Sequence, residues 1–248
     1  MPTSLTFDEH LSAIERAGHR LAEHAAEAGL EAPVPTCPTW TAAHLVAHQA
    51  MVHHWAASHA RGEPEEARNQ TEIREEEADL LGYYREGLDA LLSALRSAPL
   101  DLEAMTFLKD CGTPREFWAR RQCHETTVHA VDALSAKLGR VPTAEEAALA
   151  SDVAVDGIDE LLRGFYSRGR SKLFDGQVFS FAVAPTDSDR RWVVQVDERL
   201  TITDEGEAEP LTGTAAQLYL GLWNRGDEIK GSPELLARWR ENQRIRWS

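Results

Sequence analysis

The chain has 248 residues, of which 42% are hydrophobic and 27% are charged. These proportions are typical of a soluble globular protein and exclude a disordered or fibrous one. Asp and Glu number 41 against 26 Lys and Arg, so the formal net charge is -15. Nucleic acids and anionic membranes bind basic surfaces. The acidic balance therefore predicts that neither is a main partner.

The hydropathy, the N-terminal residues and the cysteines predict a cytoplasmic protein. No stretch approaches the roughly 20 apolar residues that span a bilayer. The first ten residues lack the basic start and the apolar run of a signal peptide. Cys37, Cys111 and Cys123 are too few and too scattered for a disulfide framework.

The first two-thirds of the chain has the pattern of amphipathic helices. Thr6 with Glu9 has the spacing of a capping box, and Thr113, Pro114 and Glu116 have that of a strong helix start. The predicted helices cover residues 6–29, 40–61, 80–95, 113–138 and 143–165. Long amphipathic helices with short connections indicate a bundle, which we expect to occupy residues 1–167.

The pattern changes after a Gly/Arg/Ser-rich linker at residues 167–172. Alternating and β-branched residues predict strands at 178–183, 192–196 and 200–203. A helix is expected over 214–223 and a short one from Ser232. Residues 172–248 are therefore predicted to form a small α+β domain, and the whole chain belongs to the α+β class.

All ten histidines lie at or before residue 129, and the last 119 residues contain none. On a helical wheel His48 lies in the middle of an apolar stripe, and a buried imidazole must have a partner. His53 and His54 point away from that stripe, so we expect them to be solvated. His59 lies three turns beyond His48. None of these three is predicted to be a metal ligand.

Glu125 and His129 form a second candidate group on the helix predicted over 113–138. Residues four apart stack on one helix face with Cβ atoms about 6 Å apart, close enough for both to bind one ion. Asp132, one turn further, is placed to orient the ring of His129. Together with His48 these residues make a set of two histidines and one carboxylate, which leaves positions open on a metal.

Simpler interpretations of the same residues stay open at this point. A histidine on an apolar face is more often a hydrogen-bonded core residue than a ligand. A Glu-x-x-x-His pair is more often an ion pair on a helix surface. Spacing alone does not decide between these interpretations and a metal site.

Three segments carry a resemblance to a known family. Residues 37–48 (CPTWTAAHLVAH) and 117–132 (FWARRQCHETTVHAVD) resemble the two signatures of the mycothiol-dependent maleylpyruvate isomerase family, which belongs to the DinB-like metalloenzymes. Residues 220–225 (LGLWNR), after the turn at 213–215, resemble its C-terminal domain. The resemblance covers nearly the whole chain in the right order.

The resemblance implies a DinB-like four-helix bundle that binds a divalent metal, usually zinc, followed by the C-terminal domain. By position His48, Glu125 and His129 match the three family ligands. The family uses a low-molecular-weight thiol, mycothiol in actinobacteria, as cofactor or co-substrate. Arg225 matches an arginine that reaches towards the substrate, and Asn224 stands where the family often has glycine.

These features predict a metal-dependent enzyme that activates mycothiol for attack on an electrophilic small molecule. Release of the thiol after bond rotation would make it a cis–trans isomerase, and retention of sulfur an S-transferase. Arg225 is the candidate catalytic residue, and Arg121 and Arg225 are candidates for binding the cofactor. Arg120 is a further candidate anchor for an anionic group, although surface salt bridges are an equal explanation for two of these three arginines.

Two other classes of function use the same residues. The protein is alternatively a non-catalytic module that binds a metal or another ligand. Loss of the fold on chelation would favour a structural metal, whereas an intact fold with lost thiol binding would favour catalysis. It is alternatively a hydrolase in which the open metal position holds hydroxide, and it would then turn over without added thiol. The sequence leaves open whether the protein is a monomer or a homodimer.

Overall fold

The computed structural model describes residues 5–64, 68–108 and 111–243, which form two compact units. The helical unit consists of Leu5–Phe107 and Cys111–Pro142, and the sheet unit contains residue 108 and residues 143–243. No helix in the described part of the chain has both the length and the apolar character needed to cross a membrane.

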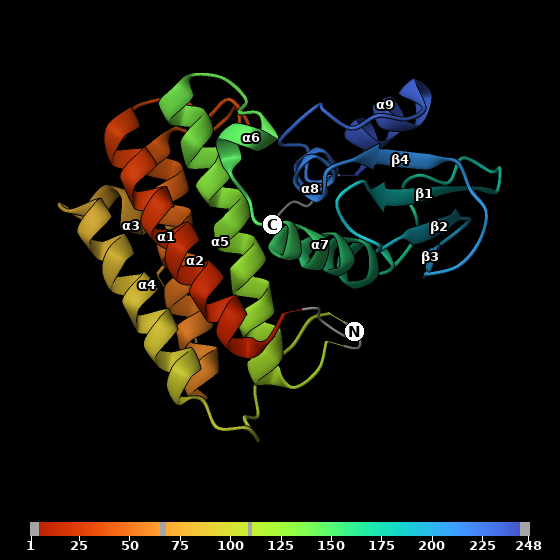
Figure 1. The fold of residues 1–248 in the computed structure, drawn as a ribbon. Helices are drawn as coiled ribbons and strands as arrows, with labels where there is room; N and C mark the ends of the chain where they lie inside the picture. The colour runs from red at the N-terminus through yellow and green to blue at the C-terminus, as the bar shows by residue number, and fades with distance from the viewer. Residues whose placement is uncertain (1–4, 65–67, 109–110, 244–248) are drawn as a thin grey trace. The chain divides into compact units, whose positions relative to one another are not determined.

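Four long helices build the helical unit, and a short fifth one joins them (Figure 1). Helix α1 packs along α5 and α2 along α4, while contacts of α2 with α5 and of α1 with α4 close the arrangement. The bounds are Phe7–Ala28 for α1, Ala42–Arg61 for α2, Gln70–Glu76 for α3, Leu80–Ser97 for α4 and Pro114–Leu138 for α5.

Local sequence signals begin and end these helices. The Thr6 side chain accepts a hydrogen bond from Glu9 N, and the Thr113 side chain accepts one from Glu116 N, which confirms the two predicted helix starts. Helix α2 ends at Gly62, where φ is 68°, a left-handed conformation that glycine adopts without a steric penalty. The short helix α3 was not predicted, although Asn69 and its neighbours form a capping box.

Close helix packing fills the core of the helical unit. Leu21, Leu45 and Ile73 are among its buried residues. A Cβ on Gly18 would lie 2.5 Å from Leu88 Cδ2, so glycine permits the approach of α1 to α4. The hydroxyl of the fully buried Tyr84 donates to Gly18 O at 3.0 Å.

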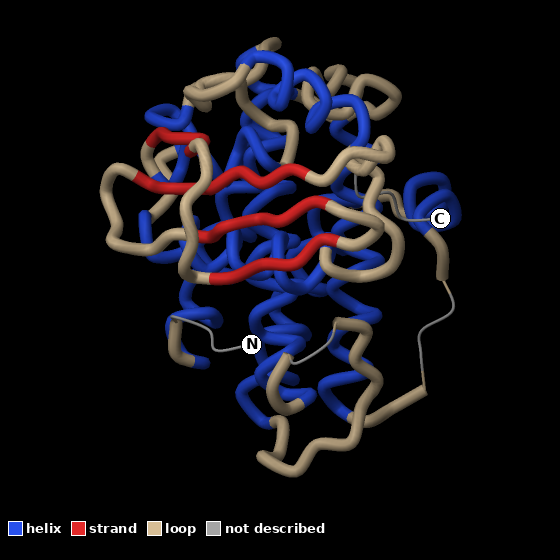
Figure 2. The backbone as a smooth tube through the Cα atoms, turned by 90° about the vertical axis from the view of Figure 1, so that its right-hand side faces the viewer, coloured by secondary structure: helices blue, strands red, loops and turns tan. Residues whose placement is uncertain are grey.

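The sheet unit contains a four-stranded sheet in the order β3-β2-β1-β4 (red in Figure 2). Strands β1, β2 and β3 pair antiparallel, whereas β4 pairs parallel to β1. The strands are Phe179–Pro185, Trp192–Val196, Leu200–Thr203 and Pro210–Gly213. The helices are α6 (Ala144–Ala147), α7 (Ser151–Asp159), α8 (Ala215–Leu222) and α9 (Pro233–Asn242), with a π-helical segment η1 (Glu160–Tyr166) after α7.

The α+β class is confirmed, with a helical N-terminal region followed by a small sheet domain. Three predicted strands are present within two residues of their expected ends, and β4 is an addition. The helix predicted over 143–165 is divided at Ala148, whose φ is 48°, and nothing in the sequence explains this break.

The division between the units differs from the predicted domains 1–167 and 172–248. The chain divides between Pro142 and Thr143, so the helical stretch over 143–166 belongs to the sheet unit. The reason is tertiary, because α7 packs against α8 of that unit. Amphipathic periodicity shows that a helix is half-buried but not which element covers it.

Candidate metal centre

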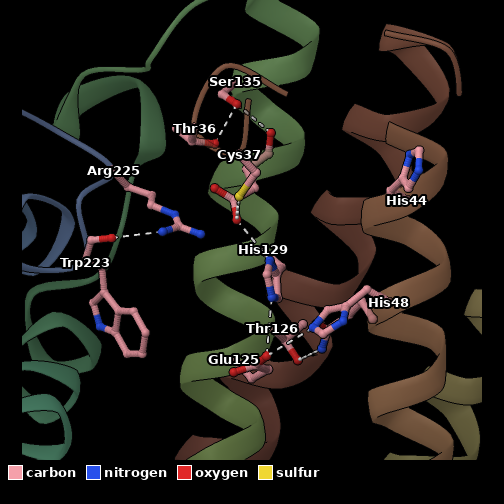
Figure 3. A network of polar contacts seen from close by, with 12 residues as sticks. Thr36, Cys37, His44, His48, Glu125, Thr126, His129, Ser135, Trp223 and Arg225 are labelled. Carbon is pink, nitrogen blue, oxygen red and sulfur yellow. Dashed lines mark hydrogen bonds and ion pairs between the residues drawn. The ribbon is translucent and has the colours of Figure 1, made fainter. Parts of the chain in front are cut away.

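Two helices of the helical unit bring three potential ligands together. His48 lies on α2, and Glu125 and His129 lie one turn apart on α5. Glu125 Oε1 is 3.6 Å from His48 Nε2 and 3.3 Å from His129 Nε2 (Figure 3). One ligand atom from each residue lies within 4.8 Å of the other two. The structure therefore places side by side the trio that the sequence predicted as metal ligands.

The burial of these side chains argues against the simpler interpretations. His48 and Glu125 are each 5% exposed and His129 is 7% exposed, so the pair on α5 is not an ion pair of a helix surface. Among the described residues, neither His48 Nε2 nor Glu125 Oε1 has a hydrogen-bond partner. Buried polar atoms without a partner are costly. A divalent ion between the three side chains would satisfy both, so the residues fit such an ion.

Metal binding requires neutral imidazoles at His48 and His129 and an ionised carboxylate at Glu125. The surroundings of His48 and Glu125 favour the required state of each. Burial lowers the pKa of His48 and thus keeps its imidazole neutral. Burial alone would raise the pKa of Glu125, but its close contacts with the two histidines and the charge of Arg121 hold it well below its usual range. Glu125 is therefore an ionised carboxylate and His48 a neutral imidazole, the states in which such side chains bind metals.

His129 lies between two carboxylates. Burial alone would lower its pKa, but its contacts with Asp132 and Glu125 outweigh that effect and raise the pKa to about 9. Its Nδ1 is 2.9 Å from Asp132 Oδ2, which confirms the contact predicted from the spacing. Because Nδ1 of His129 contacts Asp132, its Nε2 atom is directed at Glu125. A cation bound between Nε2 and Glu125 can replace the proton on Nε2.

The segment before α2 joins this network from outside. Cys37 Sγ donates to Asp132 Oδ2 at 3.5 Å, the same oxygen that His129 contacts. One residue earlier, Thr36 Oγ1 is 2.9 Å from Ser135 Oγ on α5. Figure 3 shows these contacts above the ligand trio. The Asp132 carboxylate thus contacts His129 on α5 and Cys37 in the segment before α2.

The two arginines on α5 are buried rather than on the surface. Arg121 is 1% exposed, and its Nη2 donates to Glu125 Oε2 at 3.0 Å. Arg120 is 5% exposed. The interpretation of these two as surface salt bridges is therefore wrong. Arg121 binds one carboxylate oxygen of Glu125 and leaves the other oxygen facing the histidines.

Trp40 packs against both candidate histidine ligands. Its ring centroid is 5.0 Å from that of His48 and 6.0 Å from that of His129. The indole is nearly parallel to the His129 ring, at 21°. Sequence reasoning missed this contact, although Trp40 directly precedes the start of the helix that carries His48.

The expectation that His53 is solvated is wrong. His53 is fully buried, and its Nε2 lies 2.9 Å from Gln49 Nε2 and 3.0 Å from Thr126 Oγ1. The helical wheel assumed one buried face, but α2 packs against α4, α5 and α3 and is covered on most of its circumference. His54 is half-buried against Tyr83.

His59 belongs to a different group from the ligand trio. Its ring stacks on Trp118 at a centroid distance of 4.7 Å. His53, His54 and His59 are all absent from the ligand groups found among the described residues. That these three are not metal ligands stays a prediction.

Arg225 lies in the sheet unit, directly after α8. Its Nη1 donates to Trp223 O at 3.0 Å (Figure 3), and its backbone N donates to Leu220 O at 2.7 Å. Asn224 has a φ of 59°, a left-handed conformation that glycine adopts freely and asparagine tolerates. Asparagine therefore suits the position where the resembling family often has glycine.

Comparisons with known proteins cover both units. The model of the mycothiol maleylpyruvate isomerase N-terminal domain matches residues 11–134, and that of the MDMPI C-terminal domain matches residues 152–238. Crystal structures of the mycothiol-dependent maleylpyruvate isomerase and of a histidine-to-alanine mutant of it are similar to the chain. Each has a TM-score of 0.62 and 18% identity, and covers 94% of this chain and 96% of its own. At that identity the likeness is one of fold. No curated protein matches the chain.

Proposed function

The chain belongs to the mycothiol maleylpyruvate isomerase family, and from this premise we propose that it is a metal-dependent enzyme that uses mycothiol to act on an electrophilic small molecule. The observation that carries the proposal is the convergence of three buried ligand atoms, from His48, Glu125 and His129, within 4.8 Å of one another. Membership of the family supplies the class of reaction, and the trio supplies the place for it.

The three ligands define what a bound ion contributes. His48, Glu125 and His129 would hold a divalent metal such as zinc, which would supply a Lewis acid that lowers the pKa of a thiol. The protein groups prepare that metal site. Glu125 brings a negative charge, Arg121 fixes one of its oxygens, and Asp132 orients His129. A thiolate is the reactive form of a thiol, and free thiols are mostly protonated at neutral pH.

The reaction follows from thiolate chemistry. The sulfur adds to one carbon of an electron-poor double bond, whose π electrons move onto the activating carbonyl, so that the former double bond can rotate. Collapse of that electron pair expels the thiolate and leaves the isomerised double bond, with no net change in atoms. This cis–trans isomerisation of a maleylpyruvate-type acid is the first choice, because the related structures carry that name.

S-transfer is the second outcome of the same first step. If a proton quenches the adduct before the thiolate leaves, sulfur stays on the product. The metal ligands are the same in both cases and do not separate them. In either reaction we assign Arg225 to an anionic group of the substrate or to hydrogen bonds with neutral oxygens of mycothiol, because a guanidinium binds carboxylates in bidentate geometry and donates to other oxygens. Arg121 acts on the cofactor through Glu125.

Metal analysis and a calorimetric titration test the proposal. The purified protein should hold about one divalent ion per chain, the stoichiometry of a single three-ligand site. Mycothiol should bind the metal-loaded protein more tightly than the chelated protein, because only the former offers sulfur a ligand position. Equal affinity in the two forms would show that sulfur does not reach the metal, and the thiol mechanism would have to be abandoned.

A substrate screen then separates the reactions. Maleylpyruvate and other unsaturated acids, epoxides and alkyl halides are supplied with and without mycothiol. Isomerisation restores free thiol, whereas S-transfer consumes it in proportion to product. Turnover that persists without any thiol would instead identify a hydrolase.

A further inference from the structure

Trp40 packs against both candidate histidine ligands and is not a candidate ligand itself. The planes of the His48 and His129 rings are at 72° to each other, with centroids 5.1 Å apart. The Trp40 ring contacts both of them, stacked on one and tilted by 52° against the other. An indole packed against both imidazoles limits the rotation that is open to each ring. The position of Trp40 therefore restricts both ring orientations at once.

The 33–41 loop holds Trp40 in this place by its own backbone. Val34 N donates to Trp40 O at 3.0 Å, and Trp40 N donates to Cys37 O at 2.8 Å. Pro33 and Thr41 form an isolated antiparallel bridge that closes the loop. The contacts of Thr36 and Cys37 with Ser135 and Asp132 fasten it to α5. The indole is thus tied to the same helix that carries two of the three ligands.

The chemistry of indole decides what this contact does. Indole has an N–H donor and no lone pair for a metal, so Trp40 closes one side of the centre without adding a ligand. A hydrophobic neighbour restricts water and lowers the local dielectric, which strengthens the electrostatic effect of a bound cation. We propose that Trp40 is a positioning residue of the metal centre, which sets the angle between the two imidazoles and keeps water from one side of the bound ion.

This inference rests on the proposed function, and cobalt substitution tests it separately from activity. Co²⁺ replaces zinc at such sites, and its visible absorption is intense at four or five ligands and weak at six. In Trp40→Ala we expect water to enter, the absorption to lose most of its intensity, and the Co²⁺ affinity to fall by about 10-fold, the effect of losing an outer partner of a metal ligand. Trp40→Phe keeps a ring and should retain most of the intensity.

Trp55 offers a matched control on the same unit. It is half-buried like Trp40, but its ring contacts are with His59, Phe107 and Trp118. Trp55→Ala should leave the cobalt spectrum unchanged. A Trp40→Ala protein with the spectrum and affinity of the wild type, or a Trp55→Ala protein with the same loss, would overturn the inference.

A second measurement covers the case in which Trp40→Ala does not fold. Bound Co²⁺ quenches the fluorescence of nearby indoles, and the chain has seven tryptophans. Titration should quench a fraction of the wild-type emission that is absent in Trp40→Phe. Equal quenching in both proteins would show that Trp40 does not lie beside the bound ion and would overturn the inference. A wild-type protein that takes up no Co²⁺ would instead overturn the proposed function, and the inference with it.

Discussion

Glu125 shows how single residues prepare the candidate centre. One of its oxygens accepts from Arg121 at 3.0 Å, so the other faces His48 and His129 without a hydrogen bond among the described residues. A carboxylate that is buried and only half satisfied carries a free-energy cost. A cation bound at the free oxygen would offset this cost. The residue-level geometry therefore supports a metal more directly than the spacing Glu-x-x-x-His does.

Replacement of the ligands one at a time tests this argument. His48→Ala, Glu125→Gln and His129→Ala should each lower the metal content strongly while helix content stays near that of the wild type, because the four long helices pack through other residues. His54→Ala is the control, since His54 lies on the same helix as His48 and stacks on Tyr83. Elemental analysis after dialysis measures the effect. Full occupancy in His129→Ala would refute the ligand set.

Asp132 is expected to act through His129 rather than on the metal. Asp132→Asn keeps the size of the side chain but removes the charge that His129 Nδ1 contacts at 2.9 Å. We expect a loss of metal affinity of about 10- to 100-fold, as for other outer partners of metal ligands. Competition with a chromogenic chelator gives the affinity. An unchanged metal affinity would mean that the Asp132 carboxylate does not orient His129 for metal binding.

At the scale of elements, the residue at which a helix starts was easier to predict than which of its faces other elements bury. Capping depends on neighbours within four residues, so Thr6 and Thr113 identified their helices from sequence alone. The burial of His53 depends on the packing of α2 against three other helices, which no local pattern contains. Strand β4 was missed for the same reason, because it is defined by pairing with β1.

The burial of His53 has a consequence for acid stability. Burial in α2 lowers the pKa of His53 from 6.5 to about 3. Between these values the unfolded chain binds a proton that the folded chain does not, so the free energy of unfolding falls as the pH decreases from about 6.5 towards 3. The slope is about 1.4 kcal/mol per pH unit. Above pH 6.5 this contribution is fully present.

His53→Gln removes that titration and tests the sign. Urea unfolding of the metal-free wild type and variant should be compared at pH 7.5, 6.0 and 5.0, conditions chosen on either side of the unfolded value of about 6.5. The variant can be less stable at pH 7.5, because the contacts with Gln49 and Thr126 change. The difference should shrink as the pH falls. Parallel pH curves for the two proteins would show that His53 takes up its proton in the folded state.

At the scale of the whole molecule, the ligands and Arg225 lie in different units. The family models fall on the same two parts of the chain, at 11–134 and 152–238. Both lie on their own side of the division between Pro142 and Thr143. The Gly/Arg/Ser-rich stretch at 167–172 follows a helical segment that belongs to the sheet unit, so it does not coincide with the division after Pro142. The proposed metal ligands and the proposed substrate-binding arginine are thus assigned to separate units.

Arg225→Ala separates these two contributions in the intact chain. All three proposed ligands belong to the helical unit, so the metal content should stay that of the wild type. Turnover with mycothiol should fall by about 1–3 kcal/mol in transition-state stabilisation, the range for a hydrogen bond to a charged group. Arg199→Ala removes the same charge from an exposed position of the sheet unit and should leave kcat/KM unchanged. Equal kcat/KM in the Arg225 variant and the wild type would remove Arg225 from the reaction, whereas loss of metal would show that it acts on the centre itself.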